Sequence, residues 1–495
     1  MNRQVNRLAV VAIVLLVVLI GATTYWQTWA VAGLQDRQDN AIQQVEQFTV
    51  ARGRIFADGR TFAANRMVKR HGQTLYFRKY PSSGLAAQTV GYSTLARSQS
   101  GLERSMNDYL SGATSNLSDA FRHVLDRLGN APVHGDNLQL TIRPRAQELA
   151  QQLLGTRCGA VVAMNPRTGA VYVAASSPTY NQNLIEQPNG YAKVLKIRGQ
   201  CNGASALYNR TTQGLYTPGS TFKVITAAAA LDTGAVTPDT TFYDPGYCTE
   251  YGKQVSNAGN PDQGGHEVFG HLSFSSGLEH SVNSVFCNVG KQIGAGTILE
   301  YAKRFGFYKT PPLETPGDQR YPSGLYNGGH LFDPKHPATQ VDPGRLAFGQ
   351  ERLLVTPLQM AMVASTIGNG GVVPKPYLVQ KITTSTGGTV RTTKPATLGR
   401  AIKPQTASEL NQMMQLVVTG GTGQAAQIPG VAVAGKTGTA ETNVPNVYTA
   451  WFIAFAPAQN PKVAVAVVLE QQLNGFGGAV SAPIAKQVMQ SLLGR

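Results

Sequence analysis

The stretch YTPGSTFKVITAAAALDTG, residues 216–234, places Ser220 directly after a Pro-Gly turn and at the start of an alanine-rich run that favours a helix. Lys223 follows three residues later, and positions i and i+3 of a helix lie on the same face. A serine hydroxyl needs a base within hydrogen-bond reach to act as a nucleophile, and a lysine whose pKa is lowered by burial or by a second cation can be that base. The stretch therefore predicts a nucleophilic serine with a lysine base. A serine that caps a helix beside a surface lysine is the alternative.

Two later stretches contain polar residues of the kind that would complete such a site. EHSVNSVF, residues 279–286, places Ser281 two residues before Asn283. VAGKTGTAE, residues 433–441, places four candidate site residues after an apolar, strand-like run: Lys436, Thr437, Gly438 and Thr439. The chain order S-x-x-K, S-x-N and K-T-G is that of the catalytic motifs of β-lactamases and penicillin-binding proteins. No other serine has a lysine three residues on, and the G-x-S-x-G motif of other serine hydrolases is absent.

The first 29 residues predict a membrane anchor. Residues 8–29 run without a charge for long enough to cross a bilayer core of about 30 Å. Arg3 and Arg7 precede the run, so the positive-inside rule keeps residues 1–7 in the cytoplasm and places the rest of the chain outside. A signal peptide cleaved after residues 30–32, Ala-Val-Ala, is the alternative; the apolar run is longer than the usual core of such a peptide.

Composition excludes several other classes of protein. The formal net charge is +16, but the basic residues are spread along the chain with no block interleaved with aromatic residues, so we expect no nucleic-acid partner. No C-x-x-C or H-E-x-x-H pattern occurs, and no metal or organic cofactor is implied. The four cysteines of an exported chain can form disulfides, and three pairings are possible: they are Cys158, Cys201, Cys248 and Cys287.

A chain of 495 residues is too long for one compact core, and we place a domain boundary near residue 135. Residues 30–135 are predicted to form a small mixed pedestal or interaction domain, and residues 136–495 the catalytic domain. Apolar runs on either side of Asn165–Gly169 predict a hairpin. Three helices are predicted between strand-like segments, over Thr221–Leu231, Pro357–Ile367 and Ala407–Val418, and a last helix from Ala482. This pattern predicts an α/β (α+β) fold with an antiparallel sheet.

The chain resembles the class B penicillin-binding proteins, and within them most closely the actinobacterial members. The resemblance extends beyond the three motifs over nearly the whole chain. RGRIFADG, residues 52–59, and SGLERSMNDYLSG, residues 100–112, resemble the R-G-x-I and G-L-E segments of the N-terminal domain. GQERLLVTPLQMAMVASTIGNGG, residues 349–371, resembles the T-P-L-Q-M-A helix of the family. The resemblance implies a penicillin-binding transpeptidase fold and a peptidoglycan D,D-transpeptidase that β-lactams acylate.

Carried over residue by residue, the resemblance implies a role for each motif position. Ser220 would attack the carbonyl between the last two D-alanines of a stem peptide, with Lys223 as base. Ser281, near Lys436, would relay a proton to the departing D-alanine. The remaining motif residues would bind substrate: Asn283, Thr437, Gly438 and Thr439. The backbone N–H groups of Ser220 and Thr439 would form the oxyanion hole.

Partners and alternatives also follow from the resemblance. The expected partners are peptidoglycan stem peptides, β-lactams and a SEDS-type membrane glycosyltransferase, because the pedestal domain is too small for a glycosyltransferase of its own. A membrane-anchored β-lactam sensor is an alternative, disfavoured because only seven residues precede the anchor. A β-lactamase is a second alternative. It would need a carboxylate to activate water, and Glu279 and Glu441, which flank the motifs, are expected to point away from the site.

Overall fold

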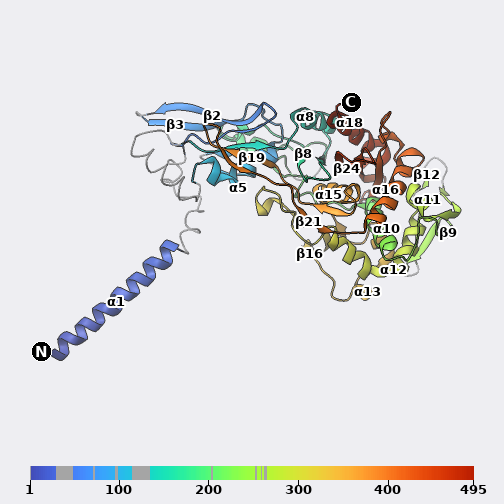
Figure 1. Ribbon diagram of the computed structural model, residues 1–495, viewed down its shortest axis with the longest axis horizontal. Coiled ribbons are helices and arrows are strands. Elements are labelled where there is room, and N and C mark those ends of the chain that lie inside the picture. The colour runs from blue at the N-terminus through green and yellow to red at the C-terminus, as the bar shows by residue number, and fades with distance from the viewer. Residues whose placement is uncertain are drawn as a thin grey trace.

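The computed structural model describes residues 2–28, 48–70, 73–94, 98–113, 134–201, 205–250, 253–257, 259–260 and 265–495. Helices and largely antiparallel sheets alternate along the chain, so the predicted mixed α/β fold is confirmed (Figure 1). The larger part of the chain is built on a five-stranded antiparallel sheet. In spatial order its strands are β22 (Ala434–Glu441), β23 (Val447–Ala456), β24 (Val463–Leu473), β7 (Gly159–Met164) and β8 (Val171–Ser177).

Helices cover both faces of this sheet, and its central strands β23, β24 and β7 are accordingly apolar at most positions. Side chains such as Val465 and Val467 of β24 face α8 (Pro144–Leu154) and α18 (Ala482–Leu493), which pack side by side. Alternate residues, such as Ala466 and Val468, point to the opposite face. There α15 (Pro357–Gly368) crosses the sheet and is buried from Pro357 to Ile367. The predicted hairpin forms between β7 and β8.

The predicted helices are present, with shifted ends. A 3₁₀ turn, η2 (Gly219–Phe222), precedes α10 (Lys223–Asp232), so the helix begins two residues later than predicted. Four further helices position the site. Helices α12 (Asn283–Arg304) and α16 (Pro404–Thr419) pack against α10, α11 (Phe274–Glu279) packs against α16, and α14 (Pro343–Ala347) packs against α12. Several short strands follow α10 and precede α11 in the sequence, and we call four of them the cleft wall: β9 (Thr241–Asp244), β10 (Tyr247–Glu250), β11 (Lys253–Ser256) and β14 (Gly270–Ser273).

A second sheet contains strands from both sides of the predicted boundary at residue 135. Its six strands, in spatial order, are β20 (Thr389–Thr392), β19 (Val379–Thr383), β6 (Asn137–Leu140), β1 (Ile55–Ala57), β2 (Arg60–Arg70) and β3 (Gln73–Lys79). Strand β1 pairs in parallel with β6, and β6 pairs antiparallel with β19. Strands from both sides of the predicted boundary therefore share one sheet, and the division of the chain at residue 135 stays a prediction.

The N-terminal helix α1 (Asn2–Thr28) contains a candidate membrane span, Arg7–Trp26, with a mean hydropathy of 2.6. None of this span is buried against the rest of the chain. Its apolar side chains are therefore available to lipid, as a membrane anchor requires. The end of the predicted anchor at Trp29 and the start of the pedestal domain, residues 30–47, lie outside the described residues.

The structure selects one of the three possible cysteine pairings. Cys158, before β7, is bonded to Cys201, and Cys248 of β10 is bonded to Cys287 of α12. The second disulfide ties the cleft wall directly to α12. Both pairs fit a chain whose catalytic part folds in an oxidising compartment.

Candidate active site

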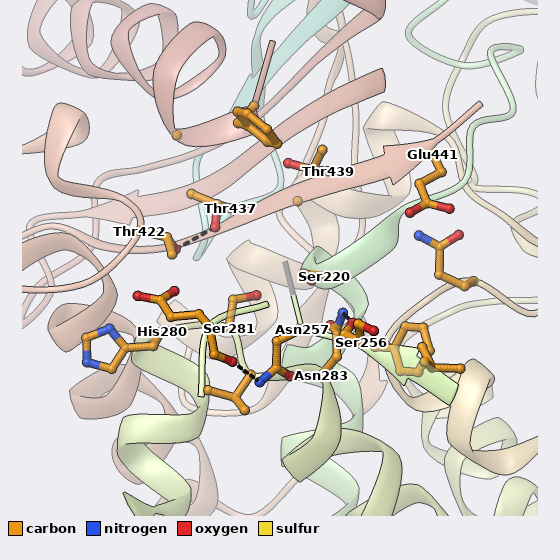
Figure 2. Close-up of a pocket in the computed structure, with 18 of the residues that line it drawn as sticks. Ser220, Ser256, Asn257, His280, Ser281, Asn283, Thr422, Thr437, Thr439 and Glu441 are labelled. Carbon is orange, nitrogen blue, oxygen red and sulfur yellow. Dashed lines mark hydrogen bonds between the residues drawn. The ribbon is translucent and has the colours of Figure 1, made fainter. Parts of the chain in front are cut away.

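The three motifs meet in a cleft of about 890 Å³ (Figure 2). Six of the eight predicted site residues line it: Ser220, Ser281, Asn283, Thr437, Gly438 and Thr439. The other two, Lys223 and Lys436, are fully buried beneath the cleft surface. Lys223 donates a hydrogen bond to Asn283, and Lys436 donates one to Ser281. Ser220 comes from η2, Ser281 from the turn between α11 and α12, and the K-T-G residues from β22. K-T-G lies within β22 rather than after a strand, because pairing with β23 continues to Glu441.

Two glycines allow Ser220 to approach β22. Gly219 has a φ of +52°, which a residue with a side chain rarely adopts, and a Cβ there would lie 2.7 Å from the Thr439 carbonyl oxygen. A Cβ on Gly438 would lie 2.8 Å from the carbonyl oxygen of Pro218. Only glycine at these two positions lets the backbone of η2 contact the backbone of β22. The contact brings Ser220 and Thr439, the predicted oxyanion-hole residues, to the same end of the cleft.

Lys223 is held by the S-x-N motif. Its Nζ donates hydrogen bonds to the Ser281 carbonyl oxygen at 2.6 Å and to Asn283 Oδ1 at 2.7 Å, with a longer contact of 3.3 Å to Ser281 Oγ. A neutral amine has two N–H groups and one lone pair. The two short hydrogen bonds use both N–H groups, so the lone pair of a neutral Lys223 stays free to accept a proton.

The surroundings of Lys223 favour this neutral form. Burial lowers its pKa well below the ordinary value, and the positive charge of Lys436 lowers it further. Burial alone lowers the pKa of Lys436 to about 7. The second-cation effect predicted from the sequence is therefore present, and its source is the lysine of the K-T-G motif.

Ser281 lies between the two lysines. Its Oγ accepts a hydrogen bond of 2.8 Å from Lys436 Nζ, which also donates to the Thr437 carbonyl oxygen at 3.0 Å. Ser281 has a φ of +61°, a left-handed conformation that costs about 1–2 kcal/mol for a residue with a side chain. Such strain is often found at functional sites. In this conformation the Ser281 hydroxyl contacts both amines, and the Ser281 carbonyl oxygen accepts from Lys223.

The predicted substrate-binding side chains already have partners in the chain. Asn283 Nδ2 donates to the Ser256 carbonyl oxygen at 2.9 Å, so its amide is engaged at both ends. Thr437 Oγ1 lies 2.6 Å from Thr422 Oγ1, shown as a dashed line in Figure 2. Thr439 Oγ1 accepts from the backbone N–H of Gly477 at 3.3 Å. Their roles toward substrate stay predictions.

Several cleft residues were not predicted from the sequence. Asn257, at the end of β11, lines the cleft together with the stacked rings of Tyr448 and Phe476, 5.3 Å apart. The expectation that Glu441 points away from the site is wrong. Glu441 lines the cleft, at its Thr439 end (Figure 2), because side chains two apart in a strand share a face, and Thr437 and Thr439 of β22 also line the cleft. None of these residues belongs to a local sequence motif.

A serine three residues before a buried lysine whose pKa is lowered, with a second lysine hydrogen-bonded to the hydroxyl of Ser281, is typical of a serine acyltransferase or hydrolase site. Comparison with known proteins identifies the class. Residues 159–490 match the penicillin binding protein transpeptidase domain, and residues 52–138 match the penicillin binding protein A dimerisation domain. The chain belongs to the penicillin-binding protein transpeptidase family.

Individual relatives agree with this assignment. The chain is 34% identical to the peptidoglycan D,D-transpeptidase PbpA of Mycobacterium tuberculosis, over all of this chain and 99% of the relative. It is also 34% identical to PbpA of Mycolicibacterium smegmatis, with the same shares covered. The ceftriaxone acyl-enzyme complex of M. tuberculosis penicillin-binding protein A superposes with a TM-score of 0.80 and 32% identity, over 91% of this chain and all of that one.

Proposed function

We propose that the chain is a peptidoglycan D,D-transpeptidase that cross-links stem peptides through an acyl-enzyme on Ser220. The observation that carries the proposal is the pair of buried lysines on either side of Ser281, which lines the same cleft as Ser220. The full-length similarity to enzymes named D,D-transpeptidases supports it over a β-lactam sensor or a β-lactamase.

Acylation begins with the transfer of the Ser220 proton to the free lone pair of Lys223. Ser220 Oγ then bonds to the carbonyl carbon of the penultimate D-alanine, and the charge on the carbonyl oxygen is stabilised by the backbone N–H groups of Ser220 and Thr439. Thr437 and the Lys436 cation bind the terminal carboxylate. Lys436 needs its proton for this role, and Lys223 must have lost its own.

The leaving group needs a proton before the C–N bond breaks. Ser281 Oγ donates its proton to the nitrogen of the departing D-alanine and recovers one from Lys436, which lies 2.8 Å away. The amine of a neighbouring stem peptide then attacks the Ser220 ester, which forms the cross-link and releases the serine. No metal or organic cofactor takes part in these steps.

The N-terminal helix supplies the location. We infer that α1 is a single membrane anchor, that residues 1–7 are cytoplasmic and that the catalytic domain is extracytoplasmic, where stem peptides are found. The span Arg7–Trp26, uncharged after Arg7, supports a membrane anchor, and Arg3 and Arg7 at its start support this orientation. The glycan strands would be supplied by a SEDS-type membrane glycosyltransferase that contacts the anchor and the pedestal domain.

Stability of the adduct tests the proposal. Full-length protein in detergent micelles is acylated with penicillin, free drug is removed and intact mass is followed over time, with and without a D-amino acid or stem-peptide amine. A transpeptidase keeps the Ser220 adduct for many minutes to hours, and amines shorten the life of a peptide-derived ester. Loss of the adduct within seconds, unaffected by amine, would instead identify a β-lactamase. Glu441→Gln is the matched variant, since Glu441 is a cleft carboxylate that could activate water.

A further inference from the structure

A fully buried carboxylate, Asp244, lies within the cleft wall and does not line the cleft. Asp244, the last residue of β9, accepts four hydrogen bonds. Its Oδ1 accepts from the backbone N–H of Gly246 at 2.9 Å and from Ser284 Oγ at 2.5 Å. Its Oδ2 accepts from Asn257 Nδ2 at 2.8 Å and from the backbone N–H of Phe269 at 2.9 Å. One carboxylate thus joins the turn after β9, the end of β11, the segment before β14 and the first turn of α12.

The hydrogen bonds continue from Asp244 to the catalytic lysine. Asn257 Oδ1 accepts from the backbone N–H of Ser284 at 3.1 Å, which fixes the end of β11 against the start of α12. The neighbours of these two residues, Ser256 and Asn283, are joined by the hydrogen bond from Asn283 Nδ2 to the Ser256 carbonyl oxygen. Asn283 Oδ1 in turn accepts from Lys223. Ser256, Asn257 and Asn283 lie next to one another in Figure 2.

We propose that Asp244 is a positioning residue of the active site, which holds the end of β11 against α12 so that Asn283 can orient Lys223. Hydrogen bonds to an ionised carboxylate are about twice as strong as those between neutral groups, so this one side chain fixes the geometry of four segments. Asp244 does not line the cleft and contacts no substrate. The inference rests on the proposed function, because it gives Lys223 the role of base.

A positioning role and a direct effect of charge predict opposite shifts in pH dependence. Among the described residues, the charged group that faces Lys223 is Lys436, from β22. The other groups around its Nζ are uncharged: Asn283 and Phe286 from α12, with the Phe286 ring centroid 5.3 Å from Nζ, and Ser281 from the α11–α12 turn. Direct loss of a negative charge at Asp244 would lower the pKa of Lys223. Loss of positioning would release Asn283 and admit water. Burial is the largest cause of the lowered pKa of Lys223, so hydration would outweigh the lost hydrogen bond to Asn283, and the pKa would rise toward its ordinary value.

The test variants are Asp244→Asn and Ser284→Ala. Asparagine keeps the shape of the side chain, but its NH₂ group faces a donor whichever way the amide lies: the Gly246 N–H on one side, or Asn257 Nδ2 and the Phe269 N–H on the other. Ser284→Ala removes a single hydrogen bond and keeps the Asp244 charge, so it stays informative if Asp244→Asn does not fold.

Asp232 offers a matched control, because it lies at the far end of the helix that begins with Lys223. It is also a buried carboxylate with several donors: Thr406 Oγ1, the backbone N–H of Lys403 and Tyr301 Oη. Asp232→Asn therefore disturbs a comparable hydrogen-bonded carboxylate without disturbing the cleft wall.

The measurement is the second-order rate constant for acylation of the full-length protein by a fluorescent penicillin, between about pH 5 and 9. The ascending and descending limbs of this pH profile report the pKa values of the essential groups in the free enzyme. Asp244→Asn is expected to lower this constant about tenfold to hundredfold near pH 7 and to move the ascending limb to higher pH. Ser284→Ala should give a smaller shift in the same direction, and Asp232→Asn none.

Three results would overturn the positioning role. One is an unchanged ascending limb of the pH profile in both Asp244→Asn and Ser284→Ala, the second is an ascending limb moved to lower pH, and the third is an equal shift in Asp232→Asn. These results leave acylation of the unmodified protein intact, so they refute this inference alone. Failure of penicillin to acylate Ser220 in the unmodified protein would overturn the proposed function and the positioning role with it.

Discussion

Glu103→Gln is expected to destabilise the N-terminal part of the chain strongly. Glu103, in the short helix α5 (Gly101–Ser105), is fully buried. Its carboxylate accepts from Arg52 Nη2 at 3.1 Å and from Arg78 Nε at 2.7 Å, and both arginine side chains are 1% exposed. One carboxylate therefore compensates two buried guanidinium groups, which join the R-G-x-I and G-L-E segments to β3.

The size of the effect follows from this burial. Removing one partner of a buried ion pair costs about 3–5 kcal/mol, because the remaining charge stays buried. Burial lowers the pKa of Arg52, the negative charge of Glu103 raises it, and the positive charge of Arg78 lowers it. Without Glu103, burial and Arg78 would both still disfavour the charged guanidinium of Arg52. Glutamine keeps the volume of the side chain, so we expect about 5 kcal/mol from charge alone. The neighbouring pair of Arg104 and Asp318 is about half exposed, and Asp318→Asn should cost less than about 1 kcal/mol.

Pulse proteolysis of the full-length protein across a urea series measures both variants. Penicillin labelling of Ser220 reports the catalytic part separately, which matters because a chain with several folded units need not unfold in one step. Cleavage of the N-terminal part should occur at much lower urea in Glu103→Gln than in Asp318→Asn, before labelling is lost. Equal midpoints for the two variants would refute the reasoning.

Three further predictions concern the lysines and the anchor. Lys223→Ala should abolish penicillin acylation while the protein stays folded, and Lys436→Ala should only weaken it; a full acylation rate in Lys223→Ala at neutral pH would contradict the base role. Because the pKa of Lys436 is about 7, raising the pH through this value removes its charge, and the acylation rate constant should fall along a limb that Lys436→Ala lacks. Protease added to intact spheroplasts should leave only a small protected fragment, whereas a mature chain beginning near Gly33 would show that α1 is a signal peptide.

Much of the fold could be predicted because its signals are local. Apolar periodicity and turn residues located the β7–β8 hairpin and the helices α15 and α18. The catalytic candidates were found because each motif is compact, although the structure joins residues far apart, with Lys223 58 positions and Lys436 155 positions from Ser281. Motif order, not spacing along the chain, made that prediction possible.

The parts that could not be predicted depend on long-range contacts. Asp244 and Asn257 stand in no motif, and their importance follows only from the packing of β9 and β11 against α12. The sheet that crosses residue 135 pairs β6 with β1 and β19, and β19 is encoded more than two hundred residues later. Glu441 was misplaced because K-T-G was expected after a strand, whereas β22 continues to Glu441 and its alternation puts Glu441 on the same face as Thr437 and Thr439.

The active site depends on a surface between the cleft wall and α12 that several bonds hold at once. Burying two lysines lowers their pKa values but opposes folding, because each must give up hydration. The disulfide between Cys248 and Cys287 joins the two sides of this surface. It closes a loop with a sequence separation of 39 residues, a constraint worth about 4 kcal/mol by chain entropy. Lys291 of α12 adds an ion pair of 2.7 Å to Glu250 of β10. The disulfide and the ion pair join β10 to α12 but do not involve the residues that hold Lys223. Asp244, in contrast, accepts a hydrogen bond from Ser284, the residue next to Asn283. Loss of Asp244 should therefore change catalysis more than stability, and loss of the disulfide should do the reverse.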